Sequence, residues 1–209
     1  GLGDVYKRQV LDVAVAPTVG PKLFTAFFES ALAEVPSIEI KMHSLGASED
    51  TSEVLSGKYH ACILPRETRP DRKLDVRPLF RERFVLGCSA KHPLAASDIV
   101  RGEDLLEFPF VDRLKCEFRE QILDHFARRE VLMRPRFRSD RDDWVQRVVA
   151  DGEAICILPE RSATAQGLVT RPIDGFVLER EVVIATVSGS TAPVEIRKIA
   201  QMAARYAWN

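Results

Sequence analysis

Short apolar runs and amphipathic stretches alternate along the first part of the chain. Residues 10–16 form a β-branched apolar run that is typical of a buried strand. Residues 23–32 then repeat apolar side chains at spacings of three and four, which predicts a helix. The pattern continues with a strand at 38–42, a polar helix at 48–56 and a strand at 60–64. Two successive strand–helix–strand units indicate a parallel sheet covered by helices.

The same alternation returns in the second half of the chain. No internal repeat, low-complexity tract or linker-like segment separates the halves. Two α/β lobes joined by crossing strands fit this pattern better than one long sheet. The further elements predicted are strands at 83–89, 108–111, 154–158 and 181–188, and helices at 116–129, 142–151 and 194–206.

Composition and charge exclude several classes of protein. The 30 Lys and Arg residues nearly balance the 31 Asp and Glu residues, so the basic excess of a free-standing DNA-binding domain is missing. The 4 cysteines form no CxxC pair, which predicts neither a disulfide framework nor a zinc site and suits a reducing cytoplasm. No apolar stretch approaches the roughly 18 residues that span a membrane. Residues 1–9 lack apolar periodicity and are interpreted as a non-native, adaptor-like stub.

Motifs of catalysis and metal binding are missing from the sequence. The 4 histidines show neither HExxH spacing nor a Cys/His cluster, and no GxSxG, GxxxxGK[ST] or GxGxxG motif follows a strand. The arginine-rich stretch 128–141 suggests nucleic acid, but four acidic residues dilute its charge and favour a solvated face: Glu130, Asp140, Asp142 and Asp143. We therefore predict a binding module that is not an enzyme and that needs no metal and no cofactor.

Four motifs occur in a characteristic order. The first strand ends in Ala-Pro-Thr at 16–18, and a Gly-Ala-Ser turn opens the segment 46–57. A strand then runs into His-Pro-Leu-Ala within 83–95, and Val-Val-Ala-Asp-Gly precedes an apolar strand and Leu-Pro within 148–159. In this order the motifs resemble the effector-binding domain of LysR-type transcriptional regulators. The resemblance covers nearly all of residues 10–206.

The resemblance implies an α/β fold of two Rossmann-like lobes, similar to type 2 periplasmic binding proteins and joined by two crossing strands. Lobe I would comprise residues 10–82 and 188–209, and lobe II residues 83–187. A small-molecule effector would bind in the cleft between the lobes. A winged helix-turn-helix, the part that would contact DNA, would precede residue 10 and is absent from this chain. A cytoplasmic homodimer or tetramer without membrane contact is expected.

The resemblance to the LysR family implies candidate effector-binding residues at the matching positions of lobe I. Thr18 occupies the family's hydroxyl position at the end of the first strand, where it would either donate to a ligand or cap the next helix. Gly46, Ala47 and Ser48 form the following turn, although the family often has Thr or Ser where Ala47 stands. Leu64 ends the third strand, where it would either face the cleft or pack in the core.

Candidate residues in lobe II surround a predicted helix start. Cys116, Glu117 and Phe118 match positions that line the cleft in several family members. Free N–H groups at a helix start suit a carboxylate ligand. Glu117 would oppose an anion there, and Arg113 with Lys115 would offset it. The expected effector is a small organic molecule, with organic acids as one candidate class.

Three alternatives remain open. Cys116 lies close to the reactive cysteine position of the peroxide-sensing members, in a similar context set by Arg119, and a helix start lowers a thiol pKa. His125 stands where those sensors have their second cysteine, which disfavours disulfide switching. A solute-binding protein of an importer has the same fold but would need a signal peptide. An enzyme on this scaffold would need a convergent acid, base or cofactor lysine.

Overall fold

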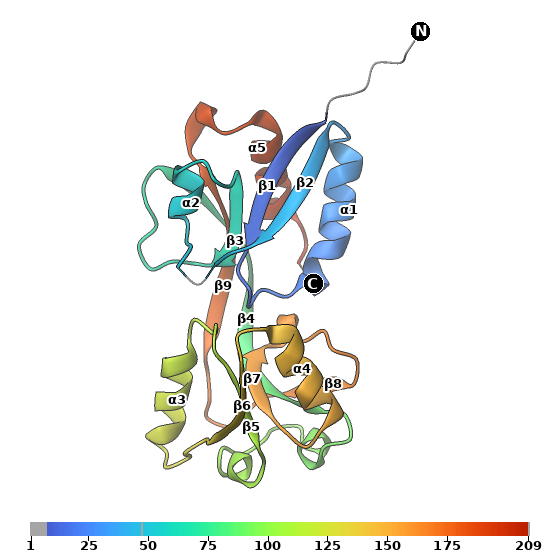
Figure 1. Cartoon of the computed structure of the whole chain (residues 1–209), viewed down its shortest axis with the longest axis vertical. Coiled ribbons are helices and arrows are strands. Elements are labelled where there is room, and N and C mark those ends of the chain that lie inside the picture. The colour runs from blue at the N-terminus through green and yellow to red at the C-terminus, as the bar shows by residue number, and fades with distance from the viewer. Residues whose placement is uncertain (1–7, 47, 209) are drawn as a thin grey trace. The chain divides into compact units, whose positions relative to one another are not determined.

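Two compact units make up the chain in the computed structural model, which describes residues 8–46 and 48–208. Of the described residues, unit 1 comprises 8–19, 23–46, 48–81 and 180–208, and unit 2 comprises 20–22 and 82–179. Two strands, β4 (Leu74–Ser89) and β9 (Glu179–Val187), pass from one unit into the other (Figure 1). Each unit has its own hydrophobic core.

Unit 1 is built on a mixed sheet. In sheet order its strands are β2 (Ile38–Ser44), β1 (Gln9–Val15), β3 (Ala61–Pro65) and β9. β1 pairs in parallel with both β2 and β3, whereas β9 runs antiparallel to β3. The predicted parallel pairing of the first three strands is therefore confirmed. All the carboxyl ends of these three strands meet at one edge of the sheet.

Helices cover both faces of the unit 1 sheet. Alternate residues of β1 point to opposite faces, so Leu11 and Val13 join one core cluster while Ala14 joins another. The first cluster lies under α1 (Phe24–Glu34) and α5 (Val194–Arg205), which bury Phe27 and Ile196 against it. The second lies under the short helix α2 (Ser52–Leu55).

Unit 2 also combines strands with helices that pack into two core clusters. Its strands are the end of β4, β7 (Cys156–Pro159) and β8 (Leu168–Arg171), both antiparallel to β4, with β5 (Phe110–Arg113) parallel to β6 (Pro135–Ser139). Helix α3 (Arg119–Ala127) packs Ile122 and Phe126 into one cluster, and α4 (Asp142–Asp151) packs Val145 and Val149 into the other. Short 3₁₀ turns lie at Pro21–Leu23, Pro93–Ala96, Glu103–Glu107, Glu160–Ser162 and Gly189–Thr191.

Several sequence predictions need correction. The polar helix expected at 48–56 is helical only over Ser52–Leu55, and the helix expected from Cys116 begins at Arg119. The interpretation of residues 1–9 as a stub outside the fold is wrong for Gln9, which begins β1 and pairs with Ile38. Residues 1–7 lie outside the described part of the chain.

The unit boundaries also differ from the predicted lobe boundaries. The prediction assigned residues 180–187 to lobe II, but they belong to unit 1 because this part of β9 pairs with β3. Residues 20–22 belong to unit 2, where the Gly20 N–H donates to Ser162 Oγ at 3.2 Å. The β9–β3 pairing and the Gly20–Ser162 hydrogen bond both join distant parts of the chain, so local sequence pattern does not predict them.

The histidine of the His-Pro-Leu-Ala motif is a buried structural residue. His92 Nδ1 accepts a hydrogen bond from the Leu94 N–H at 3.1 Å and caps the Pro93–Ala96 turn. Since Nδ1 is the acceptor, Nε2 carries the proton and donates to the Glu153 carbonyl oxygen at 3.2 Å. The imidazole is therefore neutral in the fold, and burial lowers the pKa of His92 below its ordinary value.

Unit 2 is therefore expected to lose stability in mild acid. Because the unfolded chain binds a proton at the ordinary histidine pKa of about 6.5, His92 contributes its full stabilisation above that pH. Below it, the contribution falls by at most about 1.4 kcal/mol per pH unit. His92→Asn keeps an acceptor for the Leu94 N–H but removes the titrating group. Urea unfolding of both proteins between pH 5 and 8 checks this, and a pH-independent difference between them would contradict it.

Candidate functional site

Thr18 lies in the turn that follows β1 in unit 1, and its oxygens are held by a buried arginine. Arg180 Nη1 donates to Thr18 Oγ1 at 2.9 Å, and Arg180 Nη2 donates to the Thr18 carbonyl oxygen at 2.8 Å. Thr18 is only 3% exposed. The helix-capping alternative is wrong, because α1 begins at Phe24 and no side chain caps it. Thr18 is thus a rigidly positioned hydroxyl beyond the carboxyl end of β1.

The other predicted residues of unit 1 have different surroundings. Gly46 is exposed, and its N–H donates to Glu49 Oε2 at 2.5 Å. Ser48 is exposed as well, whereas Ala47 lies outside the described residues. Leu64 is buried in the cluster that contains Ala14 and packs beside α2. Of the two readings left open for Leu64, the structure supports core packing.

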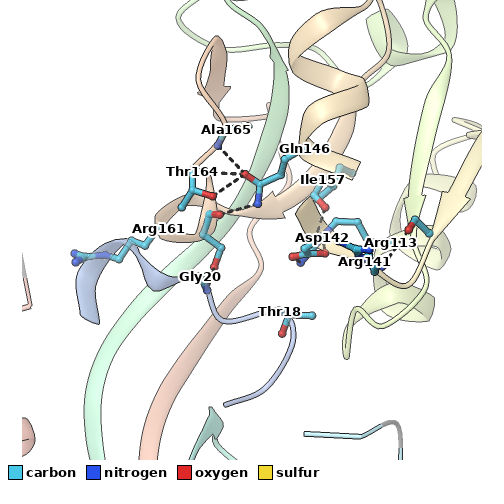
Figure 2. A network of polar contacts seen from close by, with 12 residues as sticks. Thr18, Gly20, Arg113, Arg141, Asp142, Gln146, Ile157, Arg161, Thr164 and Ala165 are labelled. Carbon is cyan, nitrogen blue, oxygen red and sulfur yellow. Dashed lines mark hydrogen bonds and ion pairs between the residues drawn. The ribbon is translucent and has the colours of Figure 1, made fainter. Parts of the chain in front are cut away.

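Arg113 ends β5 in unit 2 and forms a buried ion pair. Its Nε and Nη2 donate to the two carboxylate oxygens of Asp142 at 2.9 and 2.5 Å, and Nη1 donates to the Ile157 carbonyl oxygen at 3.4 Å (Figure 2). Burial alone would lower the pKa of Arg113, but the Asp142 carboxylate raises it overall. Lys115 Nζ lies 4.0 Å from Asp140. Arg113 is thus bound to Asp142, and Lys115 lies near Asp140.

Cys116, Glu117 and Phe118 form a turn before α3 and do not open the helix. The Cys116 N–H donates to the Arg113 carbonyl oxygen at 3.1 Å, so it is not available to a carboxylate ligand. Cys116 is buried, Glu117 is exposed, and the Phe118 ring packs edge-on against Phe84. These three neighbours in sequence thus face different surroundings. The expectation of a free helix start at Cys116 is wrong.

A second ion pair marks the true start of α3. Arg119 donates to both carboxylate oxygens of Asp112 at 2.8 and 2.6 Å, and Asp112 is almost completely buried. A cavity of about 10 Å³, lined by Asp112, Arg113, Cys116 and Arg119 among others, lies beside this pair. That volume holds about one water molecule. An organic effector therefore does not fit here without a rearrangement of these side chains.

Sequence reasoning missed a polar network centred on Gln146. The side-chain nitrogen of Gln146 donates to the Ser162 carbonyl oxygen at 2.9 Å, while its oxygen accepts from the Thr164 and Ala165 N–H groups at 2.8 and 3.1 Å. Figure 2 shows the Gln146 amide of α4 hydrogen-bonded to the segment that follows β7. Gly20 approaches the same segment so closely that a Cβ would lie 2.8 Å from Ser162 Cα. Two features of the sequence could have indicated this network: Gln146, a lone glutamine on the apolar face of a helix, and Gly20, a glycine between two prolines.

Cysteine and metal chemistry receive little support from the described residues. All 4 cysteines are free and buried, and burial raises the pKa of Cys62 and of Cys156 to about 12. Such thiols are protonated at neutral pH and are poor nucleophiles. Within residues 8–46 and 48–208, no three His, Cys, Asp or Glu side chains are grouped to hold a metal ion. No helix in the same ranges has the length and apolar character to cross a membrane.

Comparison with known proteins decides the family. A family model described as the LysR substrate binding domain matches residues 6–208. The chain belongs to the LysR substrate-binding domain family. The resemblance stated from the four sequence motifs is thereby confirmed, and the family is one of transcriptional regulators.

Relatives of this LysR domain are distant in sequence and similar in fold. It is 25% identical over 144 residues to a probable nitrogen assimilation transcriptional activator of Synechocystis. The aligned region covers 66% of this chain and 44% of the relative. The chain spans about half the length of the curated relatives it matches.

Solved structures confirm the predicted fold class of two periplasmic-binding-protein-like lobes. The reduced OxyR regulatory domain from Pseudomonas aeruginosa matches with a TM-score of 0.75 at 21% identity, covering 96% of this LysR domain and 99% of that chain. The effector binding domain of QuiR in complex with shikimate matches with a TM-score of 0.75 at 16% identity, covering 95% and 97%.

Proposed function

We propose that this LysR domain senses a small organic molecule and is part of a larger cytoplasmic transcriptional regulator. The observation that carries the proposal is the Thr18 hydroxyl, fixed by Arg180 beyond the carboxyl end of β1 in a member of this family. Ligands of open α/β sheets bind beyond the carboxyl ends of the strands. A hydroxyl already held in place loses little freedom when a ligand binds it.

Organic acids are the first class of effector to examine. The solved QuiR domain, which shares the fold, is in complex with shikimate, and shikimate is a carboxylic acid. A threonine hydroxyl donates readily to a carboxylate or a carbonyl oxygen. Gly46 and Ser48 are exposed and remain secondary candidates for contact with the effector, whereas Arg113 and Cys116 are proposed as supporting residues of unit 2.

We further propose how binding is transmitted. The DNA-binding part would belong to the half of the regulator that this chain does not span. An effector that binds one conformation of this domain more tightly than another shifts the population of the attached DNA-binding parts. Regulators of this kind act as oligomers, so a homodimer or tetramer is expected. No enzymatic step is part of the proposal, and the family match does not favour a solute-binding protein of an importer.

A peroxide switch through two thiols is not part of the proposal. Residue 125 is a histidine, and its Nε2 is buried without a hydrogen-bond partner among the described residues. Cys156 and Cys62 are held as neutral thiols by burial. Neither Cys62 nor Cys156 therefore supplies a thiolate for such a switch.

Ligand binding to a Thr18 variant tests the proposal. Thr18→Val removes the hydroxyl but keeps the backbone carbonyl that Arg180 also binds. A panel of organic acids that includes shikimate is screened by thermal shift, since a ligand that binds the native state raises the melting temperature. We expect the dissociation constant of any hit to rise about tenfold in Thr18→Val, the effect of one lost hydrogen bond.

Thr191→Val is the matched control. Thr191 is an exposed threonine of unit 1 whose hydroxyl donates only to the local Ser188 carbonyl oxygen among the contacts described. Its variant should bind each hit as the wild type does. A hit that binds equally well to Thr18→Val and Thr191→Val would place the effector elsewhere and contradict the assignment of Thr18.

A further inference from the structure

The segment that follows β1 is held by polar groups at two positions that are close together in the sequence. Thr18 accepts two hydrogen bonds from the buried Arg180 in unit 1. Two residues later, the Gly20 N–H donates to the hydroxyl of the buried Ser162 in unit 2. Val19 lies between them, and its side chain is buried in the core of unit 1. The backbone from Thr18 to Gly20 is therefore fixed at both ends.

Two prolines and a turn stiffen this short segment. Pro17 and Pro21 flank it, and a proline ring holds the φ angle of its own residue at about −65°. The Val19 N–H donates to the Ala16 carbonyl oxygen at 2.9 Å, which closes a turn directly before Gly20. Few backbone dihedral angles are therefore left to absorb a movement. A displacement of Gly20 is passed on to the residues before it.

The 3₁₀ turn that contains Ser162 is itself fixed by two buried side chains of unit 2. The Gln146 side-chain nitrogen donates to the Ser162 carbonyl oxygen at 2.9 Å (Figure 2). Glu82 Oε2 accepts from the Arg161 N–H at 3.0 Å. Gln146 and Glu82 are 5% and 2% exposed, so loss of either side chain leaves buried polar groups without a partner. The position of the turn, and with it that of Gly20, depends on these two bonds.

We propose that Gln146 is a positioning residue for Thr18 and acts on it through Ser162 and Gly20. Gln146 fixes the turn, the turn holds the Gly20 N–H, and the stiff backbone before Gly20 carries Thr18. Coupling between two sites acts in both directions. An effector that moves Thr18 therefore also moves the turn that Gln146 of α4 holds. This role in sensing rests on the proposed function, whereas the positioning of the Thr18 segment does not.

Hydrogen exchange followed by mass spectrometry tests the positioning role without an effector. Gln146→Met keeps a side chain of similar length but removes its hydrogen bonds to Ser162, Thr164 and Ala165. Exchange should become about tenfold faster in peptides covering 162–165, the effect of one lost hydrogen bond. It should also become faster in peptides covering 18–23, which none of the hydrogen bonds of Gln146 among the described residues reaches. Faster exchange at 162–165 alone would overturn the proposal.

Ser162→Ala separates the two steps of the connection. It removes the hydroxyl that accepts from Gly20 but keeps the carbonyl oxygen that accepts from Gln146. Exchange should therefore rise at 18–23 and stay unchanged at 164–165. This milder change decides the question if circular dichroism shows that Gln146→Met does not fold. Unchanged exchange at 18–23 in Ser162→Ala would show that the turn does not hold the Thr18 segment.

Arg147→Met is the matched control for Gln146→Met. Arg147 is the next residue of α4, and its exposed side chain pairs with Asp151 four positions later. Exchange at 18–23 and at 162–165 should stay as in the wild type. A rise at 18–23 equal to that in Gln146→Met would mean that any change in α4 loosens this segment, which would overturn the specific role of Gln146.

Ligand binding distinguishes this inference from the proposed function. Any hit of the thermal-shift panel should bind more weakly to Gln146→Met, as it should to Thr18→Val. The two losses should be less than additive in the double variant, because both changes act on the same contact. A hit that Gln146→Met binds as the wild type does would overturn the role of Gln146 in sensing. A panel without hits would count against the proposed function alone, and the exchange experiment would still decide whether Gln146 positions Thr18.

Discussion

Asp142→Ala should lower the free energy of unfolding of unit 2 by about 3 kcal/mol or more, the usual cost of removing one partner from a buried ion pair. Arg113 is 4% exposed and keeps its charge at every accessible pH. Without the carboxylate, a guanidinium group remains buried with one weak hydrogen bond to the Ile157 carbonyl oxygen. The loss should be visible in urea unfolding followed by circular dichroism.

Asp143→Ala is the control for this first prediction. Asp143 is the next residue of α4, carries the same charge in the same helical turn, and pairs with Arg141 at the surface. Water and salt screen that pair, so its removal should have a far smaller effect. The double variant Arg113→Met/Asp142→Leu should recover most of the lost stability, because apolar side chains replace both buried charges. Equal effects of Asp142→Ala and Asp143→Ala would contradict this account of Arg113.

Phe27→Ala should destabilise unit 1 by about 3–5 kcal/mol, the range found when a buried phenylalanine is truncated and leaves a cavity. Phe27 lies on the buried face of α1 and is 1% exposed. Its ring centroid lies 5.4 Å from those of Phe28 and Tyr206 and 5.1 Å from that of Trp208. Removing the ring therefore opens a void among three aromatic side chains. Close packing in the core keeps these side chains from moving to fill it.

Trp208 reports on the outcome of this second prediction. Its indole is buried and donates to the Ala203 carbonyl oxygen at 2.8 Å, so a looser core should shift its fluorescence to longer wavelengths in Phe27→Ala. Leu32→Ala on the same helix is the control, because Leu32 is 42% exposed and its loss should change stability by less than about 1 kcal/mol. A Phe27→Ala protein as stable as Leu32→Ala would show that the aromatic cluster does not hold α1.

Local pattern predicted some elements well and failed for others. Helix α4 has the predicted bounds of 142–151, because Val145 and Val149 repeat at the helical spacing and Gly152 follows the last turn. Strands β6 and β8 were not predicted. β6 reads Pro-Arg-Phe-Arg-Ser, so it offers one apolar side chain and begins with a proline. Its extended form depends on pairing with β5, a contact between distant parts of the chain.

Candidate site residues were predictable by type and position, but their partners were not. The motif after the first strand identified Thr18, yet Arg180, which holds its hydroxyl, is separated from it by 162 positions. Arg113 was expected to face a ligand, whereas in the structure it forms an ion pair with Asp142, 29 positions later. A buried charge needs an oppositely charged or hydrogen-bonding partner. The fold determines which residue that partner is, so the spacing of residues in the sequence does not predict it.

The insertion of unit 2 within the chain of unit 1 sets an order for folding during synthesis. Residues 82–179 are one uninterrupted stretch, and a ribosome releases them before β9 and α5. Leu11 and Val13 of β1 are covered by a cluster that includes Ile196 and Ile199 of α5. The first strands of unit 1 and α1 therefore emerge early, but the part of their apolar face that α5 covers stays exposed until the last helix has been made. During that interval this exposed apolar surface favours aggregation of the nascent chain.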